Sequence, residues 1–480
     1  MDEEIYLYAP VEDAIEKYEL PFELHDFQLR AVNDLCFGDR VGFFAEVGTG
    51  KTVMATMLGL AWDTVSDYKF VVIVPPILIK SWYRWLTSLK GIGDVLAYTG
   101  TPAKRHALDV RAHKWIIMSM QIFKNDKEHL RKLFDNLNLC GIIDEATAIK
   151  NTGSDNYKYT RDFFDSHKLM LLTGTPLSSP NDAFAYTKLK TPSVYRSKGQ
   201  FDNIHIAEKD FFGTVTKWRE LELMQKNFLL SSVRILKEDV LKHLKHPIYT
   251  PIVYDLDAKH KELYDQLAEE QLLELSSGGK IDATSASRLY NCLQQIIINW
   301  EHFSENPKNI PAGLQIVDQV CDEVFGGSLG VEETNTNKLI IFSNYKMTNR
   351  RLVEYLKKFG AVAVYSEVTP KQQNNNVDRF LTDPTCRVLI AQPLSAGMGL
   401  NLQGVSSDVL FLETPLVPKD FHQSVGRVYR EGQTKTPNIR IAIAAGTIQE
   451  RLHRQLLKKD ELVNKVQIGF MDLKEAIYGR

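Results

Sequence analysis

Short runs of apolar and β-branched residues recur along this chain, and a segment with helical spacing follows each of them. The runs fall into two groups, 41–44, 70–74, 115–118, 141–143 and 169–172 in the first half, and 339–342, 361–365, 387–390, 409–412 and 439–444 in the second. Alternation of this kind is typical of βαβ units, which build a parallel sheet covered by helices. The pattern therefore predicts an α/β protein with two parallel-sheet halves.

The segment between the two halves has a different pattern and is mainly helical from about residue 208 to residue 331. Its clearest amphipathic stretches are 262–275 and 285–300, where apolar residues recur at helical spacing. A last helix near 448–466 has leucines at the same spacing, so we expect it to pack on the second half. The expected divisions are a first lobe over residues 1–235, a helical linker or insertion over 236–335, and a second lobe over 336–480.

Composition limits the class of protein without naming a function. The 480 residues carry a formal net charge of −2, so charge alone gives no support for a uniformly basic surface. Any nucleic-acid site therefore has to be a local groove. The five cysteines form no C-x-x-C pair, which argues against a zinc site and a disulfide framework. With no signal-peptide pattern and no apolar stretch long enough for a membrane span, we expect a cytoplasmic protein.

Residues 45–52 read AEVGTGKT, and they follow a predicted strand and open a predicted helix. In that context the glycines let backbone N–H groups surround a phosphate, while Lys51 reaches the β- and γ-phosphates of ATP and Thr52 offers a hydroxyl to Mg²⁺. A glycine turn that happens to precede Lys-Thr is the alternative, and the strand–helix context argues against it. The predicted nucleotide-binding residues of this loop are Gly48, Thr49, Gly50, Lys51 and Thr52.

Two adjacent acids, Asp144 and Glu145, end the predicted strand at 141–143. A buried strand that delivers two carboxylates to one edge of a sheet suits an ATP site with Mg²⁺. Asp144 would hold the metal and Glu145 would polarise the attacking water. Taken alone, the pair could merely start a turn and cap a helix. The phosphate loop upstream favours the catalytic interpretation.

Residues 423–430, QSVGRVYR, place Arg427 and Arg430 three positions apart, on one face of an expected helix. Guanidinium groups at the γ-phosphate would offset the charge that develops during phosphoryl transfer. Arginines at this spacing more commonly mark a solvated helix face. Their position after a second α/β half favours the catalytic role.

Further blocks accompany these three motifs in a fixed order. They are LHDFQ at 24–28, VIVPP at 72–76, YTG at 98–100, DEATAIKN at 144–151, LLTGTPL at 171–177, VRILKEDV at 233–240, SAGMGLNL at 395–402, QSVGRVYREGQ at 423–433 and GTIQER at 446–451. In this order they resemble the superfamily-two helicases, and most closely the Swi/Snf-like DNA translocases, over nearly the whole chain from about Leu24. Two departures are Ala45 in place of the first loop glycine and Thr147 in place of the box histidine.

The resemblance implies two RecA-like lobes with the ATP site between them. It adds Gln28, which would read the adenine, together with Gly399 and Gln423 to the nucleotide site. It also implies contacts with the DNA backbone at Pro75, Thr99, Gly100, Thr173, Gly174, Thr175, Ser343 and Ser395. The segment at 233–240 is similar to the Arg-x-x-Lys-x-x-Val segment that leaves the first lobe in that family.

The function that the resemblance implies is an ATP-dependent DNA helicase or translocase. The compact chain is similar to phage and bacterial motors that process branched DNA, such as forks and recombination intermediates, in repair, recombination and branch migration. We expect it to act as a monomer, without zinc or membrane, in the cytoplasm of a bacterium or of a phage-infected cell. The alternatives are a motor subunit of a restriction or defence complex, a chromatin-type duplex translocase without strand separation, an RNA helicase, and a DNA-binding scaffold with a decayed ATPase.

Overall fold

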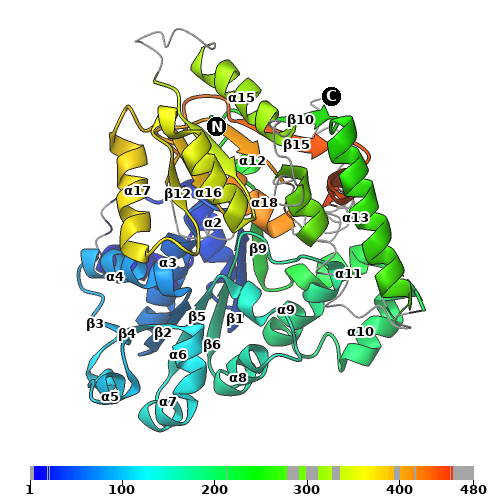
Figure 1. Ribbon diagram of the computed structural model, residues 1–480. Coiled ribbons are helices and arrows are strands. Elements are labelled where there is room, and N and C mark those ends of the chain that lie inside the picture. Colours follow the sequence, from blue (N-terminus) through cyan, green and yellow to red (C-terminus); the bar gives the residue numbers. More distant parts are fainter. Residues whose placement is uncertain are drawn as a thin grey trace. The chain divides into compact units, whose positions relative to one another are not determined.

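Two parallel sheets, each covered by helices on both faces, organise the chain. The computed structural model describes residues 5–18, 20, 22–211, 213, 215–277, 291–298, 312–326, 336–393, 401–413, 415, 418–454 and 456–457. By their contacts, the described residues up to Lys242 form one unit, blue to green in Figure 1, and those from His243 onward form a second. Within these described residues, no helix has both the length and the apolar character of a membrane span.

The first unit contains a 7-stranded sheet in which every strand pair is parallel. Its order is β3-β4-β2-β5-β6-β1-β9. The strands are β1 (Arg40–Ala45), β2 (Lys69–Val74), β3 (Val95–Ala97), β4 (Trp115–Ser119), β5 (Leu139–Asp144), β6 (Lys168–Leu172) and β9 (Ser232–Ile235). A separate antiparallel pair consists of β7 (Ile206–Lys209) and β8 (Val215–Trp218).

Neighbouring residues of the central strands enter opposite cores, as the period of two in a strand requires. Phe43 and Val72 belong to one core, and Phe44 and Val71 to the other. The first core is closed by α1 (Ala9–Lys17), α2 (Asp26–Leu35), α3 (Lys51–Val65) and α4 (Ile79–Ser88). The second is closed by α6 (Met120–Asn125), α7 (Lys127–Leu133), α8 (Asp155–Phe163), α9 (Ala183–Lys190), α10 (Lys198–His205) and α11 (Leu221–Leu229). Two short helices, α5 (Pro102–His106) and α12 (Lys237–Val240), complete the unit.

The second unit contains a 6-stranded parallel sheet in the order β10-β15-β14-β11-β13-β12. The strands are β10 (Ile248–Tyr254), β11 (Leu339–Phe342), β12 (Val362–Val364), β13 (Val388–Ala391), β14 (Asp408–Phe411) and β15 (Asn438–Ala444). One face packs on α13 (Ala258–Ser277), α15 (Ala312–Phe325), α16 (Lys346–Tyr355) and the helical residues 291–298, and the other on α17 (Pro370–Thr382) and α18 (Pro418–Val425).

These sheets confirm the predicted α/β class with two parallel-sheet halves. Each run predicted as a strand is a strand, within two residues at either end. The closing helix is seen at 448–454 and 456–457, where Ile448 packs against the core of the second unit. The rest of the stretch predicted to 466 lies outside the described residues, as do 285–290 and 299–300 of the other stretch, whose described part, 291–298, is helical as predicted.

The prediction of a mainly helical middle is wrong in its first part, because residues 206–254 contain four strands, β7, β8, β9 and β10. The division between units lies at Lys242/His243, so residues 236–242 of the expected linker, with α12, belong to the first unit, and its later described part, including β10, α13 and α15, packs in the second. β10 was missed because Pro251 interrupts its apolar run. Proline has no N–H to donate to a neighbouring strand, so within sheets it is confined mainly to edge strands. Among the described strands, β10 is an edge strand and pairs with β15 alone.

Candidate functional site

The loop between β1 and α3 has the backbone of a phosphate-binding turn. Gly48 and Gly50 have φ values of 92° and 85°, in the left-handed region that favours glycine. A side chain on Gly50 would also collide with the amide of Gln28. The hydroxyl of Thr49 donates to the carbonyl of Glu46 over 2.8 Å and tightens the turn. The loop therefore opens α3 with its backbone N–H groups at a helix N-terminus, where anions bind.

Lys51 lies folded into this loop. Its Nζ donates to the carbonyl oxygens of Ala45, at 2.8 Å, and of Glu46, at 3.0 Å. Burial lowers the pKa of Lys51, while the nearby charge of Glu145 opposes that shift. The two carbonyls stand where phosphate oxygens would accept the same N–H bonds. Ala45, the departure from a loop glycine, is the last residue of β1 and is fully buried in the core, so its methyl group is accommodated.

Gln28 joins α2 to the loop. Its Nε2 donates to the carbonyl of Thr49 over 3.1 Å, and its Oε1 accepts from the backbone N–H of His25 over 3.1 Å. The side chain is buried. The structure thus brings Gln28 to the phosphate loop, while its reading of adenine stays a prediction. Thr52 follows Lys51 in the first turn of α3 and is half-buried.

Asp144 and Glu145 end β5 at the same edge of the sheet. The Oδ2 atom of Asp144 accepts from the indole Nε1 of Trp82 over 2.8 Å, and Oδ1 accepts from the backbone N–H of Glu145 over 2.9 Å. Burial and the adjacent charge of Glu145 raise the pKa of Asp144 to about 6. Burial disfavours the charged form of this carboxylate, and a cation placed beside it would favour that form. Thr147, the other departure, donates locally to the Glu145 carbonyl over 3.4 Å.

The Thr-Gly-Thr loop after β6 packs directly on the phosphate loop. A Cβ atom on Gly174 would lie 3.3 Å from the Ala45 carbonyl oxygen and 3.4 Å from the backbone nitrogen of Val47. The backbone N–H of Thr173 donates to Phe43 over 3.2 Å, which extends the pairing of β1 and β6 into the loop. The two loops therefore contact each other through backbone atoms, so a change in the phosphate loop acts directly on the backbone of the Thr-Gly-Thr loop.

The other predicted DNA contacts of the first unit also lie beyond strand ends. Pro75 follows β2 and is half-buried, whereas Thr99 and Gly100 follow β3 and are exposed. Arg105 holds this exposed loop, because it donates to the Gly100 carbonyl and to both carboxylate oxygens of buried Asp126. All of these residues stand at the carboxyl edge of the sheet, together with Lys51 and Asp144.

In the second unit, α18 ends at Val425, so Arg427 and Arg430 lie in the turns beyond it. The expectation that they share a helix face is wrong for that reason. Arg430 donates to Asn401, and burial lowers its pKa. These turns are fixed by Gln433, whose Nε2 donates to the carbonyls of Ser406, at 3.0 Å, and Val428, at 3.1 Å. That pairing gives the Gly-Gln ending of the motif a structural reason.

Gln423 is buried in α18, and Ser343 is buried at the end of β11. The hydroxyl of Ser343 donates to Glu413 over 3.1 Å, and the backbone N–H of Asn344 donates to the other carboxylate oxygen over 3.0 Å. A fully buried hydroxyl is not presented to a DNA backbone in this structure. The predicted residues Ser395 and Gly399 lie outside the described part of the chain.

The sequence analysis assigned no role to three residues that hold these loops, namely Trp82, Arg234 and Glu413. Arg234 donates to the carbonyls of Phe44 and Gly174. No local pattern marks these contacts, because their partners are distant in sequence. Among the described residues there is no cluster of three His, Cys, Asp or Glu side chains suited to a metal ion.

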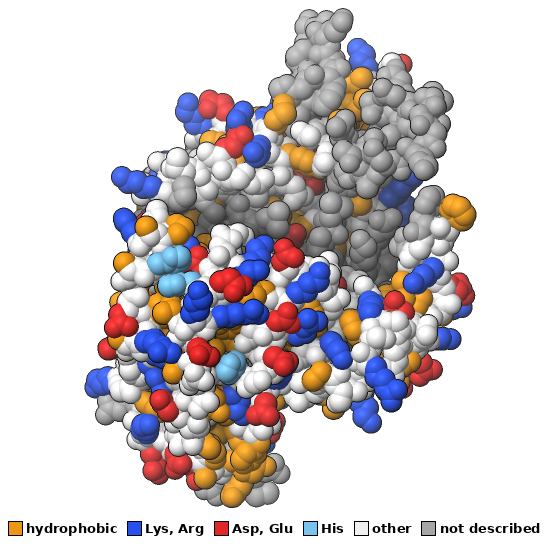
Figure 2. Space-filling view, turned by 90° about the horizontal axis from the view of Figure 1, so that it is seen from below, with side chains coloured by type: hydrophobic (Ala, Val, Ile, Leu, Met, Phe, Trp, Pro, Cys, Tyr) orange, Lys and Arg blue, Asp and Glu red, His pale blue; other side chains and the backbone are white. Residues whose placement is uncertain are grey.

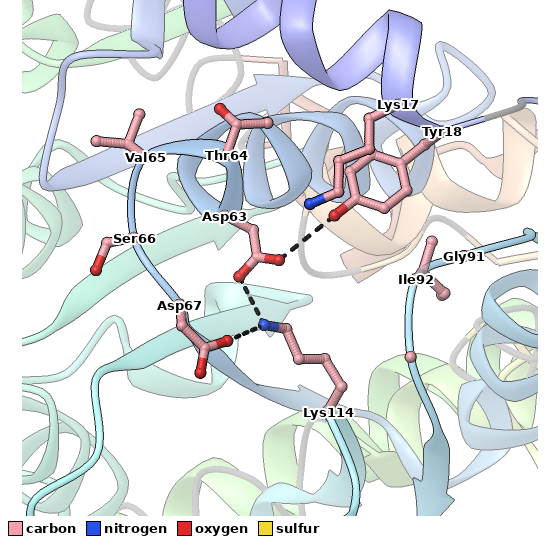
Figure 3. Close-up of a pocket in the computed structure, with 11 residues that line it drawn as sticks. Lys17, Tyr18, Asp63, Thr64, Val65, Ser66, Asp67, Gly91, Ile92 and Lys114 are labelled. Carbon is pink, nitrogen blue, oxygen red and sulfur yellow. Dashed lines mark hydrogen bonds and ion pairs between the residues drawn. The ribbon is translucent and has the colours of Figure 1, made fainter.

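A cavity of about 520 Å³ lies at the opposite edge of the same sheet, near the C-terminal end of α3 (Figure 3). Its charged groups already pair with one another. Lys114 contacts Asp63 at 2.7 Å and also bonds Asp67, and the Tyr18 hydroxyl donates to Asp63 over 3.4 Å. The cavity is far from the phosphate loop, which begins α3, and we assign the chemistry to the carboxyl edge.

Replacing Trp82 with Phe should keep the buried ring and remove the donor to Asp144. We expect ATP hydrolysis near pH 7 to fall about tenfold or more, since a hydrogen bond to a charged group contributes about 1.5–3 kcal/mol. Trp85→Phe is the matched control, because Trp85 lies on the same helix and its indole N–H donates to Thr56 over 3.0 Å, away from the acids. Equal rates for the two variants in a steady-state assay would contradict the assignment.

Glu413 predicts a pH dependence of stability in the second unit. Burial raises the pKa of Glu413 from its ordinary 4.5 to about 7. Between these values the folded state holds a proton that the unfolded state releases, so stability falls as the pH rises, by about 3 kcal/mol over the whole window. In denaturant unfolding, the free energy of unfolding of Glu413→Gln should therefore rise relative to that of the wild type between pH 5 and pH 8. Exposed Glu354→Gln should not, and a pH-independent difference for Glu413→Gln would refute the prediction.

Two families of known proteins match this chain. Residues 40–304 match the SNF2-related domain family, and residues 316–432 match the helicase conserved C-terminal domain family. Chromodomain-helicase-DNA-binding protein 1 of Homo sapiens is 25% identical over 470 residues, covering 91% of this chain and 26% of that protein. An uncharacterized ATP-dependent helicase of Mycoplasma genitalium is 25% identical over 453 residues, covering 92% of this chain and 41% of that protein.

One solved structure, the Sulfolobus solfataricus SWI2/SNF2 ATPase core in complex with dsDNA, aligns with a TM-score of 0.44 and 17% identity, covering 97% of this chain and 99% of that one. The curated relatives are longer, and this chain spans about a quarter to two fifths of their length. The matched helicase-type domains indicate a nucleic-acid-dependent ATPase. Because the first match covers more than half of its residues, the chain belongs to the SNF2-related family.

Proposed function

We propose that this chain is an ATP-driven motor that translocates on DNA. The observation that carries the proposal is the packing of the Thr-Gly-Thr loop on the phosphate loop, through Gly174 and Ala45. A loop expected to touch the DNA backbone then stands in direct contact with the loop expected to hold ATP. Chromodomain-helicase-DNA-binding protein 1, a relative over 91% of this chain, bears a name that includes both helicase and DNA binding.

The phosphate loop and the acid pair fit ATP with Mg²⁺. Lys51 would exchange the Ala45 and Glu46 carbonyls for phosphate oxygens, and Glu145 would orient the attacking water. The Thr52 hydroxyl and the Asp144 carboxylate are hard oxygen donors that suit Mg²⁺, which supplies positive charge against the β- and γ-phosphate oxygens when bound. The high pKa of Asp144 marks a carboxylate that a cation would stabilise.

Binding to DNA would use polar groups on loops and would read no sequence. Thr99 and Gly100 are exposed beyond β3, so a hydroxyl and backbone N–H groups are available there for phosphate contacts. In the Thr-Gly-Thr loop, by contrast, the hydroxyl of Thr175 is buried and its backbone N–H donates to the Thr173 hydroxyl over 3.3 Å. On the face shown in Figure 2, basic and acidic side chains are interspersed over the described residues. This face is therefore not uniformly basic, in line with the net charge of −2.

We further propose branched DNA, such as forks and recombination intermediates, as the preferred substrate, with roles in repair, recombination and branch migration. The proposal follows the resemblance of the sequence to phage and bacterial motors, and the curated relatives match this chain over about a quarter to two fifths of their own length. The same ATPase geometry would serve a duplex translocase that separates no strands, a motor subunit of a restriction or defence complex, or an RNA helicase. Action as a monomer in a bacterial or phage-infected cytoplasm is part of the proposal, and the five unpaired cysteines suit a reducing compartment.

ATP turnover with different nucleic acids tests the function directly. Steady-state hydrolysis would be compared without nucleic acid and with single-stranded DNA, linear duplex, forked or four-way DNA, and RNA. We expect forked and four-way DNA to stimulate most and Lys51→Ala to abolish turnover while it retains DNA binding, since Lys51 lies in the phosphate loop and donates to carbonyls of that loop. Equal stimulation by every duplex would restrict the function to translocation, and stimulation by RNA alone would refute the DNA proposal.

Loss of a cationic group in the second unit tests the role proposed for Arg427 and Arg430, the supply of positive charge to the transferring phosphoryl group. We expect Arg430→Ala to lower the maximal rate by roughly 10³, the scale of other arginine fingers. Arg379→Ala serves as the control, because Arg379 forms an exposed ion pair with Asp383 on α17. A wild-type rate for Arg430→Ala would remove Arg430 from the mechanism.

A further inference from the structure

The edge strand β9 brings a half-buried arginine, Arg234, next to the phosphate loop. β9 is parallel to β1, with Arg234 opposite Phe44 and Ile235 opposite Ala45. The two strands therefore end together, and the chain that follows each of them starts at the same level of the sheet. Arg234 is half-buried there, beside the last residues of β1.

A single guanidinium nitrogen of Arg234 connects two loops. Its Nη1 donates to the Phe44 carbonyl over 2.8 Å and to the Gly174 carbonyl over 3.2 Å. Phe44 immediately precedes the phosphate loop, and Gly174 is the middle residue of the Thr-Gly-Thr loop. From its place on β9, the arginine thus holds these two loops together at the point where Gly174 approaches the Ala45 carbonyl.

The residues after β9 hold the phosphate loop a second time. The backbone N–H of Glu46 donates to the Ile235 carbonyl over 3.0 Å, and the Glu46 carboxylate accepts from the backbone N–H of Lys237 over 2.9 Å. Lys51 grips the same stretch from the front, at the carbonyls of Ala45 and Glu46. When Lys51 leaves these carbonyls for phosphate oxygens, the loop retains its rear attachments to β9 and the residues after it.

We propose that Arg234 is a positioning residue that couples the phosphate loop to the Thr-Gly-Thr loop, so that nucleotide binding at the first changes the second. The inference rests on the proposed function, in which the Thr-Gly-Thr loop contacts DNA. The hydrogen bonds of Arg234 go to the carbonyls of Phe44 and Gly174, which belong neither to the acid pair nor to the residues assigned to hold the phosphates of ATP. Removal of Arg234 should therefore affect communication more than hydrolysis itself.

Arg40 provides a matched control for a merely structural arginine. It lies at the first residue of β1, at the opposite edge of the same sheet. Its guanidinium also donates to backbone carbonyls, those of Leu189 at 3.2 Å, Phe164 at 2.7 Å and Asp165, and it lies 3.9 Å from the Asp165 carboxylate. Arg40→Gln and Arg234→Gln therefore remove the same kind of contact from the same sheet, and only the second removes it from the proposed coupling.

The first experiment measures ATP hydrolysis by the full chain with and without linear duplex DNA, for the wild type, Arg234→Gln, Arg234→Lys and Arg40→Gln. For Arg234→Gln we expect the ratio of stimulated to basal turnover to fall about tenfold, with the KM for ATP changed less than about threefold. Arg234→Lys should recover part of the ratio, because an ammonium can donate to these carbonyls with less fixed geometry. Arg40→Gln should lose thermal stability and keep the ratio.

A second measurement keeps the coupling testable apart from DNA. Backbone hydrogen exchange of residues 173–177 would be followed with and without a non-hydrolysable ATP analogue. We expect the analogue to change exchange there in the wild type and in Arg40→Gln, and to change it little in Arg234→Gln. A wild-type ratio and a wild-type exchange response in Arg234→Gln would overturn the proposal, as would equal losses in Arg40→Gln. A wild type that DNA does not stimulate would refute the proposed function, while the exchange result would still decide the coupling.

Discussion

Parallel pairing in register is the constraint on which the site of the first unit depends. Leu172 lies opposite Phe43 on one side and opposite Asp144 on the other, and Ala45 lies opposite Ile235. Because the strands run in one direction and end at similar levels, the loops that follow them emerge at one edge. Phosphate loop, acid pair and Thr-Gly-Thr loop come from distant parts of the sequence, and only this register makes them neighbours.

Electrostatics then set the resting state of that edge. Two cations, Lys51 and Arg234, lie near three acids, Glu46, Asp144 and Glu145, and the charges influence one another across the loop. Burial raises the pKa of Asp144 and lowers that of Lys51, which means that it disfavours the charged form of each group. A bound group of opposite charge would stabilise that form. Lys51 donates to backbone carbonyls, and Asp144 accepts from the Trp82 indole. A ligand that carries phosphates and a divalent cation would take the place of the carbonyls at Lys51 and would add a positive charge beside Asp144, while the Trp82 hydrogen bond continues to hold the carboxylate.

The features that sequence predicted are those encoded locally. Strand cores are continuous apolar runs, and the turn at Gly48 and Gly50 needs left-handed backbone that only its glycines supply readily. The contacts that were missed join residues far apart in the chain, 62 positions between Trp82 and Asp144 and 190 between Arg234 and Phe44. The edge strand β10 was missed because Pro251 breaks its pattern. Neither a contact between distant residues nor an edge strand interrupted by proline produces a periodic pattern in the sequence.

The comparison of Arg40 with Arg234 shows why chemistry alone does not assign a role. Each guanidinium donates to backbone carbonyls, three for Arg40 in β1 and two for Arg234 in β9. At the amino edge the acceptors belong to α9 and to the two residues after α8, which anchor helices to the sheet. At the carboxyl edge they belong to the end of β1, just before the phosphate loop, and to the Thr-Gly-Thr loop after β6. Direction in a parallel sheet therefore separates a structural arginine from one that can transmit a change.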